Sequence, residues 1–413
     1  MSEQKNNKGA ASFWVPRKAI DALLKAKATA AEIAAYLIIA KHTPVTGDYS
    51  TAGEKAIRTK AGMSTGAKDK AIEGLLSIDV NGSRAKNRQS KNAKKYTRLV
   101  YTAEDWTRLT GEVLPHGPTQ RGQIRYVLNT FRVYDELKDG FATPNMVWFG
   151  ANLVAGVNTF ERPLYALRQC GDRAAWLLLL LYVHNAMDEW GGVSPTTTLY
   201  EAYEREEDYR VGRTNYNISH WTKKNATGWY SLMSPVLKGL YDPRDNEARD
   251  KASQDVFWPA FNALVSHGFI YEIVTVTTAQ PGEKNPHKND FPLYELDARS
   301  LHGYKPKGEE GVAGETAMIA RDLGYPVTDG EGHFYGKYAA IAPTGTPIRV
   351  IGIYRLRFRV ANPKNAYVTD AWKQISERQK EADGWIADVR QRAHLTKPEP
   401  EEASSDDEPQ FPF

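Results

Sequence analysis

A pair of short amphipathic segments separated by a tight break constrains the fold of this chain more than any other feature. The segments cover residues 51–61 and 65–77, and the three residues between them are Gly62, Met63 and Ser64. Glycine can adopt the backbone conformation that turns the chain sharply, and a serine side chain can cap the helix that follows it. The sequence therefore predicts two short helices joined by a turn.

Two further helices are predicted upstream of this pair. One begins near Pro16 and the other near Thr29, where Thr29 and Glu32 have the spacing of a capping box. Thr51 and Glu54 have the same spacing and predict a cap for the first helix of the pair. Apolar residues at helical spacing are expected to face the core, and these positions are Ile33, Tyr36, Leu37, Ala40, Ala71, Ile72 and Leu75.

The segment "NGSRAKNRQSKNAKKYTR" from Asn81 to Arg98 contains no carboxylate. Its cations are Arg84, Lys86, Arg88, Lys91, Lys94, Lys95 and Arg98. It lies between a short predicted strand, Leu76 to Val80, and a second strand that begins at Tyr96, so we expect it to form the tip of a β-hairpin. A cation that neutralises a DNA phosphate releases condensed counterions, so the segment predicts affinity for DNA. The alternative is a solvated basic loop without a ligand.

The order of helices, turn and hairpin resembles a winged helix-turn-helix domain over roughly residues 13–106. The resemblance implies that residues 65–77 form a recognition helix and that the cationic hairpin is the wing. Thr65, Lys68, Asp69 and Lys70 are predicted on the exposed side of that helix. Thr65, near the helix start, could reach bases, whereas Lys68 and Lys70 are expected to hold phosphate.

A second series of helices followed by a hairpin is predicted between residues 145 and 302. The run "AAWLLLLLYV" from Ala174 to Val183 predicts a fully buried helix and is too short to span a membrane. Residues 196–208 and 214–225 are predicted as helices, and a helix ending at Gly268 precedes a hairpin with a turn-rich tip at 280–290. This order resembles a second winged-helix unit. The charges of its tip nearly balance, so protein contact is as well supported as DNA contact.

The C-terminal third contains a predicted strand in which Arg355, Arg357 and Arg359 alternate with apolar residues. Such a strand would place three guanidinium groups on one face, either along a nucleic-acid backbone or as charges that protect a sheet edge. Residues 369–393 predict an amphipathic helix that docks within the chain or mediates a homodimer. Its inward-facing residues are predicted to be Trp372, Ile375, Trp385, Ile386 and Val389.

Charge is distributed unevenly along the chain. Residues 1–106 contain 19 Lys and Arg against 10 Asp and Glu, a net charge of +9, while residues 397–413 contain one Lys against six acids, a net charge of −5. The last residues resemble the acidic tip of bacterial single-stranded DNA-binding proteins, apart from an inserted Pro409-Gln410. The resemblance implies that the tip engages replication and repair partners, and the residues concerned are Asp406, Asp407, Glu408, Pro412 and Phe413.

Several kinds of chemistry lack a matching pattern. The nine His and the single Cys are scattered without the spacing of a zinc site, and Gly336-Lys337 lacks the surrounding residues of a phosphate-binding loop. The chain is therefore predicted to have no metal site, no cofactor and no enzymatic activity. A polar N-terminus and one cysteine predict a cytoplasmic location without membrane association.

Together these patterns predict an α+β, mainly helical protein with tandem winged helix-turn-helix domains, a small C-terminal α+β part and an acidic tail. The expected boundaries are 1–12 disordered, 13–106 first winged helix, 107–144 connector with one amphipathic helix, 145–302 second winged helix, 303–396 C-terminal strands and helix, and 397–413 disordered. The tandem arrangement resembles the replication initiators of plasmids and other mobile elements. That resemblance implies binding to double-stranded DNA and recruitment of host replication proteins through the tail. The alternatives are a transcriptional repressor and a protein that engages partners of single-stranded DNA-binding protein.

Overall fold

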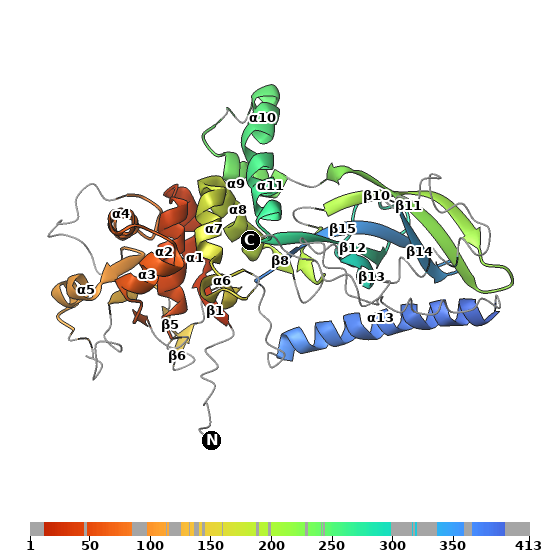
Figure 1. The fold of residues 1–413 in the computed structure, drawn as a ribbon, viewed down its shortest axis with the longest axis horizontal. Coiled ribbons are helices and arrows are strands. Elements are labelled where there is room, and N and C mark those ends of the chain that lie inside the picture. The colour runs from red at the N-terminus through yellow and green to blue at the C-terminus, as the bar shows by residue number, and fades with distance from the viewer. Residues whose placement is uncertain are drawn as a thin grey trace, which may run out of the picture. The chain divides into compact units, whose positions relative to one another are not determined.

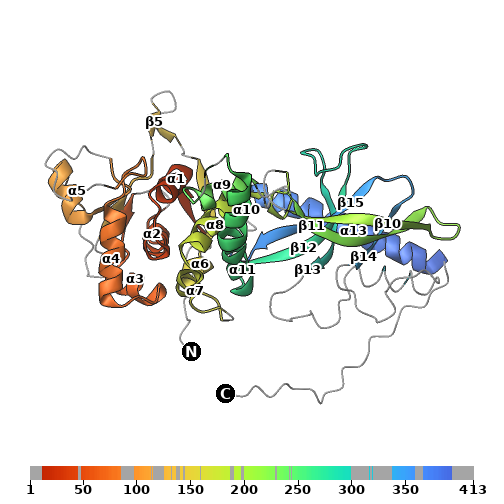
Figure 2. The ribbon, with the colours of Figure 1, turned by 90° about the horizontal axis from the view of Figure 1, so that it is seen from above.

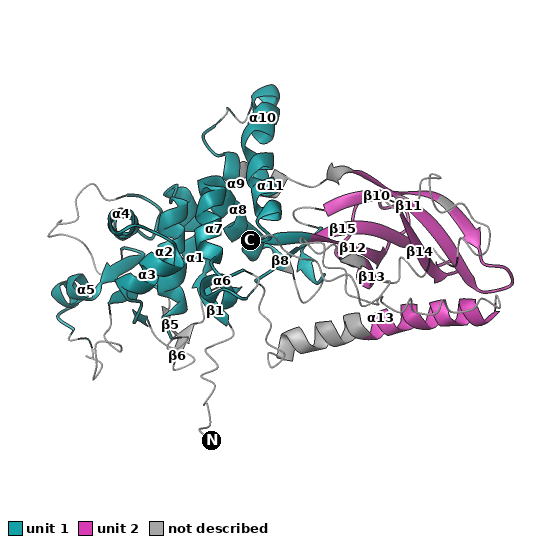
Figure 3. Ribbon diagram, in the orientation of Figure 1, with its two compact units in different colours: residues 1–199, 228–271, 354–370 teal, residues 200–227, 272–353, 371–413 magenta. Residues whose placement is uncertain are grey.

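The chain folds into two compact units, each built from separated stretches of sequence (Figure 3). Unit 1 comprises residues 1–199, 228–271 and 354–370, and unit 2 comprises residues 200–227, 272–353 and 371–413. The computed structural model describes residues 12–392 except 45–47, 85–96, 113, 115–124, 132, 136–139, 143–144, 159, 187–189, 197–199, 228–229, 241, 243, 299–315, 317–318, 320–336 and 359–365.

Unit 1 contains most of the helices (Figure 1). Its helices are α1 (Arg17–Lys25), α2 (Ala30–Lys41), α3 (Glu54–Lys60), α4 (Thr65–Leu76), α5 (Ala103–Thr110), α6 (Asn152–Ala155), α7 (Pro163–Cys170), α8 (Asp172–Val183), α9 (Tyr230–Leu237), α10 (Asn246–Ala252), the π-helix η2 (Ser253–Phe257) and α11 (Trp258–Ser266). Its strands are β1 (Ser12–Pro16), β2 (Tyr49–Ser50), β3 (Val100–Thr102), β4 (Tyr126–Leu128), β5 (Val133–Asp135), β6 (Gly140–Ala142), β7 (Met146–Gly150), β8 (Asn185–Ala186) and β9 (Gly192–Val193).

Helices α2 and α8 form the centre of unit 1. The predicted capping box is present at the start of α2, where the Thr29 side chain accepts from the Glu32 N–H and Glu32 accepts from the Thr29 N–H. Helix α2 contacts α3, α4, α7 and α8, and every residue of α8 from Ala174 to Tyr182 is buried. The Asp172 carboxylate at the start of α8 accepts from the Ala30 N–H at 2.7 Å, which joins the two helix N-termini. The prediction of a fully buried helix at this position is confirmed.

A three-stranded sheet in the order β2-β4-β3 lies beside these helices. Strand β4 pairs with β2 on one side and with β3 on the other, and its three residues are buried. The predicted amphipathic helix in the 107–144 connector is therefore wrong, because this stretch supplies β4, β5 and β6 instead. Strand β4 is specified by pairing with residues that are distant in sequence, which helical periodicity within the segment does not reveal.

Unit 2 is built around a six-stranded sheet in the order β13-β12-β15-β10-β11-β14. The strands are β10 (Tyr200–Arg210), β11 (Tyr216–Thr227), β12 (Ile270–Thr278), β13 (Pro292–Ala298), β14 (Lys337–Pro343) and β15 (Ile348–Leu356), and all the strand pairs with a determined register are antiparallel. Two of these strands include residues of unit 1, because β12 begins with residues 270–271 and β15 ends with residues 354–356 of that unit.

Two predicted helices, residues 196–208 and 214–225, are wrong. They form the long hairpin β10–β11, in which Tyr200 lies opposite Thr227 and Arg210 opposite Asn217. The turn between them contains Gly212 at φ 50°. A glycine at positive φ permits a tight reversal of the chain, and the predicted helices did not take this turn into account. The chain is thus α+β with a substantial antiparallel sheet, not mainly helical, and residues 145–302 do not form a second winged helix.

Helix α13 (Ala366–Arg392) packs against the core of unit 2. Ile386 and Val389 are buried in that core and Trp385 lies against it, so the predicted inward face is confirmed at these three positions. Trp372 and Ile375 lie where the structure does not describe the side chains. Helix α13 also bonds to the main chain of the outer strand β13: the Gln379 side chain accepts from the Glu295 N–H, and the Arg378 guanidinium donates to the Pro292 carbonyl.

A tyrosine side chain from one outer strand of the sheet makes hydrogen bonds to main-chain groups of the other outer strand. The Tyr294 hydroxyl of β13 donates to the Ile341 carbonyl of β14 at 2.6 Å and accepts from the Ile341 N–H at 2.8 Å. Tyr294 is 1% exposed, and burial raises the pKa of its phenol well above the ordinary value. The sheet therefore curls so that its two outer strands are joined through this hydroxyl. The hydroxyl binds the Ile341 N–H and carbonyl, which could otherwise pair with another strand.

Replacing Tyr294→Phe is expected to lower the free energy of unfolding by about 1–3 kcal/mol. The substitution keeps the ring and leaves the Ile341 N–H and carbonyl without their hydroxyl partner. Urea denaturation followed by fluorescence measures the change, and Tyr165→Phe serves as the control because Tyr165 is 41% exposed. Equal stability of the two variants would show that the hydroxyl contributes nothing to closure of the sheet.

Candidate nucleic-acid interface

Helices α3 and α4 meet at a tight turn, as the sequence predicts (Figure 2). Gly62 has φ 58°, and the Met63 N–H donates to the Arg58 carbonyl at 2.9 Å. The Ser64 side chain accepts from the Ala67 N–H at 3.2 Å, so the predicted cap of α4 is confirmed. The predicted cap of α3 is wrong, because its N-cap residue is Gly53 and no side chain bonds there.

Side chains of helix α7 hold this turn in place. The Arg168 guanidinium donates to the carbonyls of Ala61 and Gly62 at 2.7 and 2.8 Å. The Tyr165 ring lies so close to Gly62 that a Cβ atom there would overlap it. Neither residue was singled out from the sequence, since their role depends on packing across more than 100 positions. The turn between α3 and α4 is therefore held in place by contacts with α7.

Replacing Gly62→Ala is expected to destabilise the protein by about 2–3 kcal/mol, of which about 1–2 kcal/mol comes from the left-handed backbone conformation. The remainder arises because the new methyl group meets the Tyr165 ring. The measurement is urea denaturation, with Gly66→Ala as the matched control, since nothing lies within 4 Å of a Cβ at Gly66. A Gly62→Ala protein as stable as this control would contradict the described contact.

The base of the predicted wing is present directly after α4. The Val80 N–H donates to the Thr97 carbonyl at 2.8 Å, and the Leu99 N–H donates to the Ile78 carbonyl at 3.1 Å. Helix α4 extends through Leu76, so the first arm of the hairpin is shorter than the predicted strand. The tip falls in residues 85–96, outside the described part of the chain. The five predicted contacts there, which we call the wing-tip cations, are Lys86, Arg88, Lys91, Lys94 and Lys95.

The two predicted DNA contacts that flank the tip, Arg84 and Arg98, are engaged within the fold. The Arg84 guanidinium donates to both carboxylate oxygens of Glu32, at 2.9 and 2.8 Å, and to the carbonyls of Ala26 and Gly74. The Glu32 bond raises the pKa of Arg84. Arg98 is 7% exposed. The expected solvent-facing position is wrong for Arg98, which is buried. Arg84 remains 36% exposed, but its guanidinium is paired with Glu32 at the base of the hairpin.

Helix α4 exposes Thr65, Asp69 and Lys70, whereas Lys68 is buried. The Lys68 ammonium lies 2.5 Å from Glu54 Oε2 and 2.8 Å from Asp69 Oδ1, and hydrogen bonds to Asp69 and Glu54 raise its pKa. The predicted phosphate contact by Lys68 is therefore not available. Instead, its single charge partly offsets the two carboxylates, which would otherwise repel a polyanion more strongly near the start of α4.

The predicted row of exposed guanidinium groups near the C-terminus is absent from the described residues. All nine residues of β15 are buried, because β15 lies between β12 and β10 in the sheet. Arg355 is 5% exposed and donates to the Gly191 carbonyl at 2.5 Å, and the Arg357 guanidinium lies 5.3 Å from the centre of the Phe160 ring. Arg359 lies outside the described residues. An exposed edge strand was the wrong interpretation.

Among the described residues, His, Cys, Asp and Glu side chains form no group of three or more able to hold a metal ion. None of the described helices is long and apolar enough to cross a membrane. The predicted partner-binding residues of the acidic tail lie outside the described part of the chain. Comparison with protein-family models, with curated proteins and with solved structures gave no match.

Proposed function

We propose that this protein binds double-stranded DNA through the winged helix-turn-helix formed by α2, α3, α4 and the hairpin base at residues 78–80 and 97–99. The observation that carries the proposal is the position of this hairpin. It begins two residues after α4 and is bonded at its base, and its tip contains the five wing-tip cations without a carboxylate. Phosphate attraction and base reading would therefore act on the same duplex.

The exposed start of α4 supplies the second part of the interface. Thr65 and Lys70 are exposed there, and Arg58 of α3 lies beside Thr65, with Nη1 3.5 Å from the hydroxyl. Hydroxyl and guanidinium groups can both bond to bases or phosphates in the major groove. Lys68 offsets only one of the two charges of Glu54 and Asp69, so the exposed cations at this end of the interface are Lys70 and Arg58.

Fluorescence anisotropy with the full chain and a labelled duplex of random sequence tests DNA binding. Binding is expected at low ionic strength, and it should weaken steeply as salt rises. Selection from a random duplex pool then gives the preferred site, on which Thr65→Ala should lose about 1–3 kcal/mol while affinity for random DNA stays unchanged. A chain that fails to bind any duplex at low salt would refute the proposal.

The biological role that we propose for this DNA binding is replication initiation on a plasmid or another mobile element, with recruitment of host proteins through the acidic tail. Residues 145–302 do not form a second winged helix, so this role is supported only by the N-terminal domain and by the resemblance of the acidic tail. Footprinting on the element's own origin tests it: protection of repeated sites is expected, and protection without preferred sites contradicts it. Derepression of a neighbouring promoter on gene deletion, without loss of copy number, would instead assign a repressor.

A further inference from the structure

Strand β10 is paired on one side along its whole length and on the other side only at its start. Its pairing with β11 runs from Tyr200 to Arg210, while β15 pairs with it only from Tyr200 to Ala202. The residues Glu204–Asp208, which we call the β10 edge, pair with β11 alone among the described strands. Beyond Ala202 the strands β10 and β15 diverge, although continued antiparallel pairing would place Glu204 and Arg205 opposite Arg349 and Ile348.

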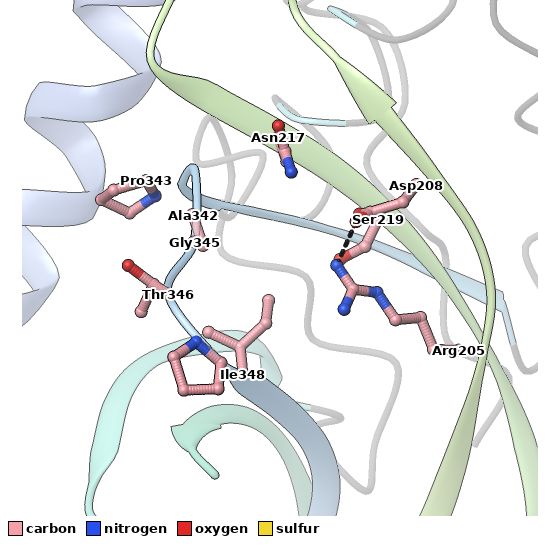
Figure 4. Close-up of a pocket in the computed structure, with 10 residues that line it drawn as sticks. Arg205, Asp208, Asn217, Ser219, Ala342, Pro343, Gly345, Thr346 and Ile348 are labelled. Carbon is pink, nitrogen blue, oxygen red and sulfur yellow. Dashed lines mark hydrogen bonds and ion pairs between the residues drawn. The ribbon is translucent and has the colours of Figure 1, made fainter. Parts of the chain in front are cut away.

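Two neighbouring cavities occupy the space where these strands diverge. The first has a volume of about 270 Å³ and lies between the β10–β11 hairpin and the connection from β14 to β15 (Figure 4). Its lining includes Arg205, Asp208, Ser219, Thr346 and Ile348. The second has a volume of about 250 Å³, and its lining includes Tyr203, Trp221, Lys284, Ile348 and Arg349. Ile348 is common to both, so the cavities follow each other along the gap.

The β10 edge is acidic. The strand "YEAYEREEDYR" contains five carboxylates and two arginines, a net charge of −3. Arg205 is already paired with Asp208 at 2.5 Å, and Glu204 is paired with Lys224, while Glu204, Glu206 and Asp208 are exposed. Two copies of this edge lying side by side would oppose like charges, which disfavours pairing between copies of the chain. The same charges favour a basic partner.

We propose that the β10 edge and the two cavities form a docking site for an extended, basic segment of another protein, which adds a strand between β10 and β15. In this mode of recognition the main-chain bonds to an open edge give affinity, and cavities that accept alternate side chains give specificity. Alternate side chains of a strand lie about 6.6 Å apart on one face, and two such side chains would enter the two cavities. Charge and the bulge between Arg205 and Glu207 disfavour pairing with a second copy, while the cavities beside the edge offer space for the side chains of a basic ligand.

The test uses the full chain and a labelled decapeptide of alternating Lys and Val with blocked ends. This Lys peptide is expected to bind and to slow hydrogen exchange at the amides of the β10 edge and of Ile348–Val350. A peptide of alternating Glu and Val should bind at least about tenfold more weakly. A second Lys peptide in which Pro replaces two Val residues keeps the charge but lacks main-chain donors, and it should also lose about tenfold. Equal binding of the Pro peptide would overturn the proposal, because charge alone would then explain the affinity.

A double variant, Glu204→Gln with Glu206→Gln, provides the matched test on the protein. It should bind the Lys peptide about tenfold more weakly, while Glu73→Gln with Glu247→Gln, the same change at exposed positions of unit 1, should leave binding unchanged. Identical losses in both variants would overturn the site. Protection of the β10 edge that appears when protein concentration alone is raised would also overturn the proposal, because it would assign the edge to a second copy. Protection on addition of duplex DNA would overturn it as well, because it would assign the edge to nucleic acid.

Discussion

Replacing the five wing-tip cations by Gln is expected to lower the affinity of the full chain for duplex DNA by roughly 10³- to 10⁴-fold near physiological salt. Each cation that contacts a phosphate contributes about −0.9 to the slope of log affinity against log salt, so five contacts predict a slope of about −4 to −5 for the parent protein. Arg84 and Arg98 are left out because both are held within the fold. The measurement is anisotropy over a series of salt concentrations.

The control for this prediction replaces five exposed cations elsewhere in unit 1. Suitable positions are Lys18, Lys27, Arg162, Lys238 and Lys251, which are exposed and lie outside both the wing and the helices α2, α3 and α4. Their replacement changes net charge by the same amount, so it should lower affinity only through the weak long-range field. The wing variant should lose affinity equally for every duplex sequence. Equal losses for wing and control variants would show that net charge, not the wing, attracts the DNA.

Replacing Arg84→Ala is expected to lower the free energy of unfolding by about 2–3 kcal/mol without changing the salt slope of DNA binding. Glu32 is buried and would lose the guanidinium that satisfies both of its oxygens. The loss is smaller than for a fully buried pair because the Arg84 side chain is 36% exposed. Urea denaturation measures the stability, and anisotropy at a temperature where the variant stays folded measures the slope.

A second substitution separates charge from geometry at Arg84. Arg84→Lys keeps the positive charge but loses the paired bonds to Glu32 and the reach to the Ala26 and Gly74 carbonyls. We expect it to recover only part of the lost stability. Lys55→Ala, at an exposed position of α3, controls for removal of a cation and should change stability by less than about 0.5 kcal/mol. If Arg84→Ala were as stable as Lys55→Ala and flattened the salt slope, Arg84 would be a phosphate contact after all.

Gly74 shows why the base of the wing tolerates little change. It lies inside α4, where a glycine is ordinarily unfavourable, and a Cβ there would overlap the Glu32 carboxylate. The Gly74 carbonyl also accepts from Arg84. Glu32 thus has three roles. It completes the capping box of α2, it binds the Arg84 guanidinium, and it lies against α4 at Gly74. The sequence indicated the first of these roles and gave no sign of the other two.

Local chemistry by itself determined the helical elements that carry their own signals. The capping box at Thr29, the Ser64 cap and the Gly62 turn were predictable because side chains and backbone within a few residues decide them. The buried helix at Ala174–Val183 and the inward face of α13 followed from composition and periodicity. Of these, the Gly62 turn and the Ser64 cap set where the candidate recognition helix begins.

Tertiary structure alone decided which charges are free and which segments are strands. Arg355 has the alternating pattern of an exposed strand, yet β15 lies between two other strands. Lys68 and Arg98 are buried, and the Arg84 guanidinium is held by the buried Glu32, 52 residues away in sequence. Strands β4, β10 and β11 resemble helices in their residue spacing. Strand β4 pairs with the distant β2, while β10 and β11 pair with each other across the Gly212 turn and with the distant strands β15 and β14. Pairing and burial are long-range energies, so a pattern read within one segment does not contain them.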